Sequence, residues 1–88
     1  MPPYEVFIER EVERNIRKIP KELRKGIFSL IIKLKINPRA SGIRKITKTQ
    51  NCYRIRLGDY RIIYEVDDKR RIINIFRIRH RKEAYRNL

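Results

Sequence analysis

Residues 52–66 read CYRIRLGDYRIIYEV, and this stretch predicts a β-hairpin. Apolar and polar residues alternate on both sides of Gly58-Asp59, a dipeptide typical of two-residue hairpin loops. With these two residues as the loop, Leu57 pairs with Tyr60, and Arg56 faces Arg61. The register places Arg54, Arg56 and Arg61 on one face of the hairpin. The other face carries the apolar side chains Tyr53, Ile55, Leu57, Ile62 and Tyr64.

Upstream of the hairpin, the apolar period changes from two residues to that of a helix. Residues 4–9 predict a short strand, and Val12, Ile16 and Ile19 follow at helical spacing in residues 10–19. Pro20 suits the first turn of a second helix, which ends at Asn37-Pro38. Two helices joined by so short a connection form an antiparallel hairpin. The apolar stripe of the second helix comprises Leu23, Ile27, Leu30, Ile31 and Leu34.

The remaining strands complete a small sheet. Residues 44–47 predict a short edge strand, residues 67–70 a turn, and residues 71–78 the last strand. We therefore expect one α+β domain, residues 1–88. In it, an N-terminal strand precedes a helical hairpin that covers one face of a small, mainly antiparallel sheet.

The face that the helices leave open carries the signal for function. Like charges at facing positions destabilise a sheet, so Arg54, Arg56 and Arg61 are a poor choice for stability alone. The chain has 24 Lys and Arg against 10 Asp and Glu, with net +4 in residues 1–37 and +10 in residues 38–88. This distribution favours a polyanionic partner held by arginine, which binds phosphate oxygens in bidentate fashion. The alternative is a solvated face whose guanidinium groups extend into water.

Further candidate contacts come from the last strand. Regular pairing places Asn74 and Phe76 on the arginine face, with Phe76 beside Arg61, where its ring could stack on a base or pack under the C-terminal tail. Arg77 and Arg79 occupy the alternate positions of the strand and so point to the other face, unless a bulge near Ile78 changes this. The candidate RNA contacts are Arg44, Lys45, Arg54, Arg56, Phe76 and Arg79.

Other features of the sequence narrow the function class. Cys52 is the single cysteine, and no Cys/His cluster with metal-ligand spacing occurs, so we expect no cofactor. The first residues lack the apolar run of a signal peptide, and no stretch approaches the ~20 apolar residues of a membrane span. We expect a cytoplasmic protein without a membrane partner.

The residues near the C-terminus offer acid–base chemistry. His80 is the only histidine, and a neutral imidazole can accept a proton. A lone histidine is more often structural. Tyr85 carries a phenol that can donate or accept. Together with preorganised cations, such groups suit metal-free RNA cleavage, in which the 2′-hydroxyl attacks the phosphate.

At this point the residues resemble a family. The run from Cys52 to Val66, the preceding segment 43–46, and His80-Arg81 with Tyr85 resemble the RelE branch of the RelE/ParE toxin superfamily. The resemblance covers essentially the whole chain. It implies a cofactor-free nuclease that cuts messenger RNA in the ribosomal aminoacyl site and so inhibits translation. It also implies a neighbouring RelB-like antitoxin, and operator DNA bound only through the antitoxin complex.

The same resemblance implies roles for single residues. Arg54 and Arg56 match basic residues used in binding and acid–base work, Arg61 and Arg81 match phosphate-stabilising arginines, and Tyr85 matches a tyrosine at the substrate. The best-studied branch has lysines at the first two positions. Arginine is effectively never deprotonated, so the base is His80 or Tyr85, or the site works mainly by electrostatics.

Three alternatives stay open. A ParE-like toxin shares the fold and poisons DNA gyrase, although Arg81 and Tyr85 argue against it. A non-catalytic RNA-binding module needs only the basic face. A decayed toxin would keep only antitoxin binding and repression of its operon. An antitoxin fits the apolar area that we expect Ile63, Phe76 and Ile78 to leave beside the arginines.

Overall fold

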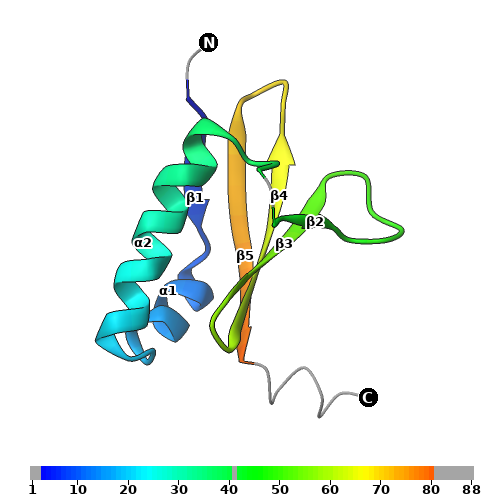
Figure 1. Ribbon diagram of the computed structural model, residues 1–88. Helices are drawn as coiled ribbons and strands as arrows, with labels where there is room; N and C mark the ends of the chain where they lie inside the picture. Colours follow the sequence, from blue (N-terminus) through cyan, green and yellow to red (C-terminus); the bar gives the residue numbers. More distant parts are fainter. Residues whose placement is uncertain (1–2, 41, 81–88) are drawn as a thin grey trace.

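The change of apolar period along the chain produces the layers seen in the structure, a computed structural model that describes residues 3–40 and 42–80. Two helices lie on one side of a five-stranded sheet, which confirms the α+β class (Figure 1). The elements are β1 (Glu5–Ile8), α1 (Arg10–Arg17), α2 (Lys21–Ile36), β2 (Arg44–Lys45), β3 (Cys52–Leu57), β4 (Tyr60–Asp67) and β5 (Ile72–His80).

The sheet has the strand order β1-β5-β4-β3-β2. Strands β2 to β5 pair antiparallel, and β1 joins β5 in parallel. The central hairpin has the register that the sequence predicts, with Leu57 opposite Tyr60 and Arg56 opposite Arg61. Gly58 turns the chain with φ +59°, a left-handed conformation that favours glycine. The β3–β4 ladder therefore fixes which side chains face the helices.

The helices end close to the predicted positions. Helix α1 stops at Arg17, two residues before the predicted end, and Ile19 still enters the core with 4% of its surface exposed. Pro20 occupies the N-cap position of α2. The fully buried core joins α1, α2 and the inner sheet face through Val12, Ile27, Leu34, Ile62, Tyr64, Val66 and Ile73. A second stripe on α2, Phe28, Ile32 and Ile36, is exposed instead.

A polar clasp ties the segment after α2 to the turn between β4 and β5. The guanidinium of Arg39 donates to both Asp68 carboxylate oxygens at 3.0 and 2.8 Å, and its Nε donates to the Tyr53 hydroxyl at 2.7 Å. The Tyr4 hydroxyl donates to Asp68 at 2.7 Å. These donors hold the pKa of Asp68 below its usual value. The clasp fixes the path that leads from α2 to β2.

No helix among residues 3–40 and 42–80 has the length and apolar character that a membrane span needs.

Candidate nucleic-acid interface

An irregularity in the β4–β5 ladder reshapes the open face of the sheet, which is the face opposite the helices. Arg61 faces Arg79 and Ile63 faces Arg77, but the next residue of β4, Tyr64, faces Ile75. Phe76 is therefore the extra residue of a β-bulge. The expectation that Phe76 lies beside Arg61 is wrong: the bulge puts Arg79 in that place, and both Arg77 and Arg79 on the open face.

The same bulge moves Ile78 away from the open face. Ile78 faces Ile62 and is 7% exposed, so it belongs to the core and does not contribute apolar surface beside the arginines. The sequence does contain a feature that indicates this shift, but the prediction from regular alternation did not use it. The buried residues Ile75 and Ile78 are three positions apart, and the charged Arg77 stands between them. Two residues three positions apart point to opposite faces of a regular strand, so both can be buried on one side only if a bulge lies between them.

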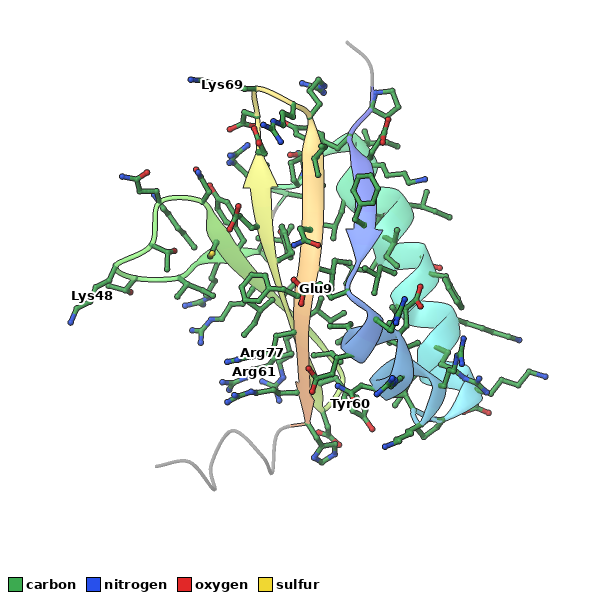
Figure 2. All side chains as sticks on the ribbon, turned by 180° about the vertical axis from the view of Figure 1, so that it is seen from behind. Glu9, Lys48, Tyr60, Arg61, Lys69 and Arg77 are labelled. Carbon is green, nitrogen blue, oxygen red and sulfur yellow. The ribbon has the colours of Figure 1, made fainter. Side chains whose placement is uncertain are left out.

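Six arginines lie in two rows across the open face, and we call them the arginine cluster. Facing residues of neighbouring strands point to the same side, with Cβ atoms about 4.5–5.5 Å apart. Figure 2 shows Arg61 and Arg77 close together on this face. One row is Arg56, Arg61 and Arg79 on β3, β4 and β5; the other is Arg44, Arg54 and Arg77 on β2, β3 and β5, with Ile63 of β4 between the last two.

Among residues 3–40 and 42–80, no carboxylate forms an ion pair with an arginine of the cluster. The ion pairs there are Arg39–Asp68 at 2.8 Å and Arg70–Asp67 at 3.9 Å, both outside the cluster. Arg56 donates from Nε to the carbonyl of Gly58 at 3.2 Å, a contact that leaves its charge uncompensated. Because facing like charges cost up to about 1 kcal/mol a pair, the cluster is suited to an anion from outside.

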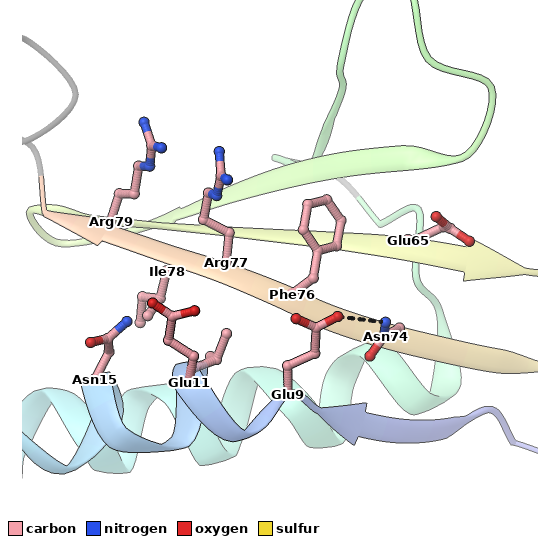
Figure 3. Close-up of a pocket in the computed structure, with 10 residues that line it drawn as sticks. Glu9, Glu11, Asn15, Glu65, Asn74, Phe76, Arg77, Ile78 and Arg79 are labelled. Carbon is pink, nitrogen blue, oxygen red and sulfur yellow. Dashed lines mark hydrogen bonds between the residues drawn. The ribbon is translucent and has the colours of Figure 1, made fainter. Parts of the chain in front are cut away.

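Three hollows that share lining residues follow one another along the cluster, and we call them the track. The first, of about 310 Å³, is lined by Arg44, Arg54, Arg56 and Arg61. The second, of about 240 Å³, shares Arg54 and Arg61 with the first and adds Ile63 and Arg79. The third, of about 540 Å³, shares Arg79 and reaches α1 (Figure 3). The track crosses the strands, as a single-stranded polyanion laid over the sheet would.

The structure does not bring every candidate residue to this track. Lys45 faces Tyr53, whose side chain lies on the helix side. Lys45 therefore points to the helix side, whereas Arg44 points to the open face. His80 faces Tyr60, and the two rings meet edge to face with centroids 5.0 Å apart. His80 lines a hollow of about 400 Å³ with Lys18 of α1, on the other side of the sheet from the cluster.

The remaining two candidates, Arg81 and Tyr85, lie outside the described residues. Within the described part of the chain, no group of three His, Cys, Asp or Glu residues is placed to hold a metal ion. Cys52 is half-buried.

Comparisons with known proteins match nearly the full chain. The family described as "ParE toxin of type II toxin-antitoxin system, parDE" matches residues 6–85. The putative toxin RelE1 of Methanocaldococcus jannaschii is 32% identical over an alignment of 87 positions, which covers 96% of this chain and 97% of that protein. Toxin RelE of Mycobacterium tuberculosis is 27% identical over 85 residues, 96% of this chain and 88% of that protein.

Solved structures show the same arrangement. A chain of the archaeal RelE–RelB complex from Pyrococcus horikoshii OT3 superposes with a TM-score of 0.83 at 30% identity, covering 90% of this chain and 96% of that one. A chain of the RelB–RelE antitoxin–toxin complex from Methanococcus jannaschii gives a TM-score of 0.77 at 28% identity, covering 93% and 98%.

Proposed function

Because this chain belongs to the RelE/ParE superfamily of type II toxin–antitoxin toxins, we propose that it is an endoribonuclease that cuts messenger RNA in the aminoacyl site of the ribosome. The observation that carries the proposal is the arginine cluster, whose charges have no carboxylate partner among residues 3–40 and 42–80. Single-stranded RNA supplies phosphates at intervals along a flexible backbone and so fits a track of arginines.

The reaction that suits this surface is internal transfer at phosphorus. The 2′-oxygen of one nucleotide attacks the adjacent phosphorus, a 2′,3′-cyclic phosphate forms, and the bond from phosphorus to the 5′-oxygen breaks. The 2′-hydroxyl loses its proton to a base, and the leaving 5′-oxygen gains one. Arg61 and Arg79 face each other and would neutralise the charge that develops on the phosphate oxygens.

The charges of the arginines and the position of His80 bear on which group carries the proton. Arg54 and Arg56 stay protonated and act as fixed charges. His80 lies on the helix side of the sheet, beside Tyr60 and Lys18, and so points away from the cluster. This leaves Tyr85 as the group that transfers the proton, or a site that works mainly by electrostatics, and the family resemblance gives Arg81 a phosphate contact.

We also propose a RelB-like antitoxin as the protein partner, because two of the similar structures are RelE–RelB complexes. An acidic amphipathic segment would complement the arginine cluster, and the half-buried Ile63 and Phe76 supply apolar contacts beside it. Operator DNA would be bound only through that complex. The proposal fails if the acidic product of the neighbouring gene shows no affinity for the purified toxin.

The nuclease is tested with programmed ribosomes and primer extension on the messenger. We expect new messenger ends at the aminoacyl-site codon with the wild type, and at least tenfold weaker cleavage with Arg61→Ala and Tyr85→Phe. The matched control is Arg17→Ala, which removes an exposed arginine from α1. Intact messenger at high toxin concentration would contradict the proposal.

The name of the matching family supports a second candidate, a gyrase poison of the ParE type. A supercoiling assay with purified DNA gyrase separates the two. Inhibition of supercoiling together with intact messenger on ribosomes would select the second function.

A further inference from the structure

The third hollow of the track differs in chemistry from the other two. It lies where β1 has ended opposite Ile75, so that the rest of β5 is a sheet edge with α1 beside it. Its volume of about 540 Å³ falls within the range of small-molecule sites. The arginine cluster supplies only Arg77 and Arg79; the other polar lining residues are Glu9, Glu11, Asn15, Glu65 and Asn74.

The bulge gives this hollow an aromatic wall. Residues that follow each other in a regular strand point to opposite faces, but Phe76 and Arg77 both rise from the open face of β5 (Figure 3). Phe76 is half-buried and lines the hollow, so part of its ring is accessible. An accessible aromatic ring next to a phosphate-binding arginine is the usual platform on which a nucleic-acid base stacks.

Carboxylates surround that platform. Asn74 donates from its amide nitrogen to Glu9 at 3.3 Å, which orients the Glu9 carboxylate at the rim of the hollow (Figure 3). Glu11 and Glu65 are exposed, and within residues 3–40 and 42–80 no ion pair joins either of them to Arg77 or Arg79. Ionised carboxylates only accept hydrogen bonds, so they select donors and repel phosphates.

We propose that this hollow is a base-binding pocket for a nucleobase that carries an exocyclic amino group, namely adenine, cytosine or guanine. The base stacks on Phe76 and its amino group donates to Glu9 or Glu65, while Arg77 and Arg79 hold the adjoining phosphate. Repulsion by the carboxylates keeps the RNA backbone over the arginine cluster, so only the base enters. The inference rests on the proposed function, because it requires RNA on the cluster.

Oligoribonucleotides that differ only in the amino group provide the test. We would measure the affinity of the full chain for eight-residue oligocytidine against oligouridine, and oligoadenosine against oligomers of purine riboside. The wild type should bind the amino-bearing member of each pair about tenfold more tightly, the size of one hydrogen bond to a charged acceptor. Glu9→Ala and Glu65→Ala should bring the ratio toward one, and Phe76→Leu should weaken both members alike.

Glu22→Ala is the matched control, since it removes an exposed carboxylate from the first turn of α2. Glu22 lines none of the three hollows, so the control should leave both affinities and their ratio unchanged. In the two test variants, loss of a negative charge beside the track strengthens binding of both members alike, so only direct readout changes the ratio. A thermal melt of each variant verifies folding.

Several results would overturn the pocket. One is a wild-type ratio near one, or a ratio that Glu9→Ala and Glu65→Ala leave unchanged, while Arg61→Ala still weakens binding of every oligomer. A second is loss of antitoxin binding in Phe76→Leu while its affinity for both members of each pair stays unchanged, which would assign the hollow to the protein partner. Absence of affinity for any oligomer would remove both the pocket and the proposed function.

Discussion

Individual arginines of the cluster are fixed charges whose effect depends on their neighbours. Arg61 has an arginine opposite it on both sides, Arg56 on β3 and Arg79 on β5. Its side chain is half-buried, so its charge is less screened by solvent than that of the exposed Arg56. We infer that Arg61 is the member of the cluster that gains most when a phosphate binds.

Tyr64 shows what a single buried hydroxyl does for the fold. Its side chain is fully buried, and its Oη donates to the Pro38 carbonyl at 2.6 Å. Tyr64→Phe should lower the free energy of unfolding by about 1–2 kcal/mol, because the carbonyl loses its partner. Urea unfolding measures the change. A variant as stable as the wild type would mean that water replaces the hydroxyl.

Burial also raises the pKa of Tyr64 above the ordinary value of 10.0. The stability that the protonated phenol contributes is therefore present below pH 10 and is lost as pH rises through the higher folded value. The wild type should lose stability above pH 10 more steeply than Tyr64→Phe. Thermal melts between pH 8 and 11 compare the two slopes, and equal slopes would contradict the assignment.

At the scale of elements, the β3–β4 hairpin depends on its turn. Gly58 has φ +59°, and an added Cβ would lie 3.4 Å from the Leu23 side chain, so space is available and the backbone is the obstacle. Gly58→Ala should cost about 1–2 kcal/mol, whereas Gly58→Asn should cost less because asparagine tolerates this conformation. Urea unfolding of both variants tests this. Equal stability of Ala and Asn variants would show that the turn relaxes out of the left-handed region.

Helices and the hairpin were predictable from the sequence, whereas the pairing of strands that are distant in the sequence was not. The Gly58-Asp59 turn fixes the hairpin register, and the apolar stripe of α2 fixes its buried face through Ile27, Leu30 and Leu34. The parallel pairing of β1 with β5 joins residues 5–8 to residues 72–75, and no turn specifies such a distant register. The bulge escaped prediction for a similar reason, since regular alternation assigned Arg77 and Arg79 to the wrong face.

The candidate site was predictable in part, for the same reason. Arg54, Arg56 and Arg61 were placed together from the hairpin alone, and the structure adds Arg44, Arg77 and Arg79 to them. The side of the sheet on which His80 lies depends on the bulge, so the sequence could not give it. Arg81 and Tyr85 lie one and five residues after the end of β5 in the sequence, and their roles stay predictions.

At the scale of the whole molecule, charge is distributed unevenly over the surface. The net charge is +14, yet three carboxylates border the third hollow, while the first two hollows are lined by arginines and uncharged residues. A general excess of basic residues would bind RNA anywhere on the surface. A cluster bordered by acids instead defines a path, and binding should depend on the few arginines along it.

Salt dependence distinguishes these two cases. For single strands, the logarithm of affinity falls with the logarithm of salt concentration by about 0.7 for each phosphate neutralised. Arg61→Ala should therefore reduce the slope by about 0.7, and Arg61→Ala with Arg79→Ala by about 1.4. Arg17→Ala on α1 changes the net charge by the same amount but should leave the slope unchanged, because Arg17 lines none of the three hollows. Affinities of an oligoribonucleotide between 50 and 300 mM salt give the slopes. Equal reductions in Arg17→Ala and Arg61→Ala would mean that RNA responds to the total charge, and the path across the sheet would have to be abandoned.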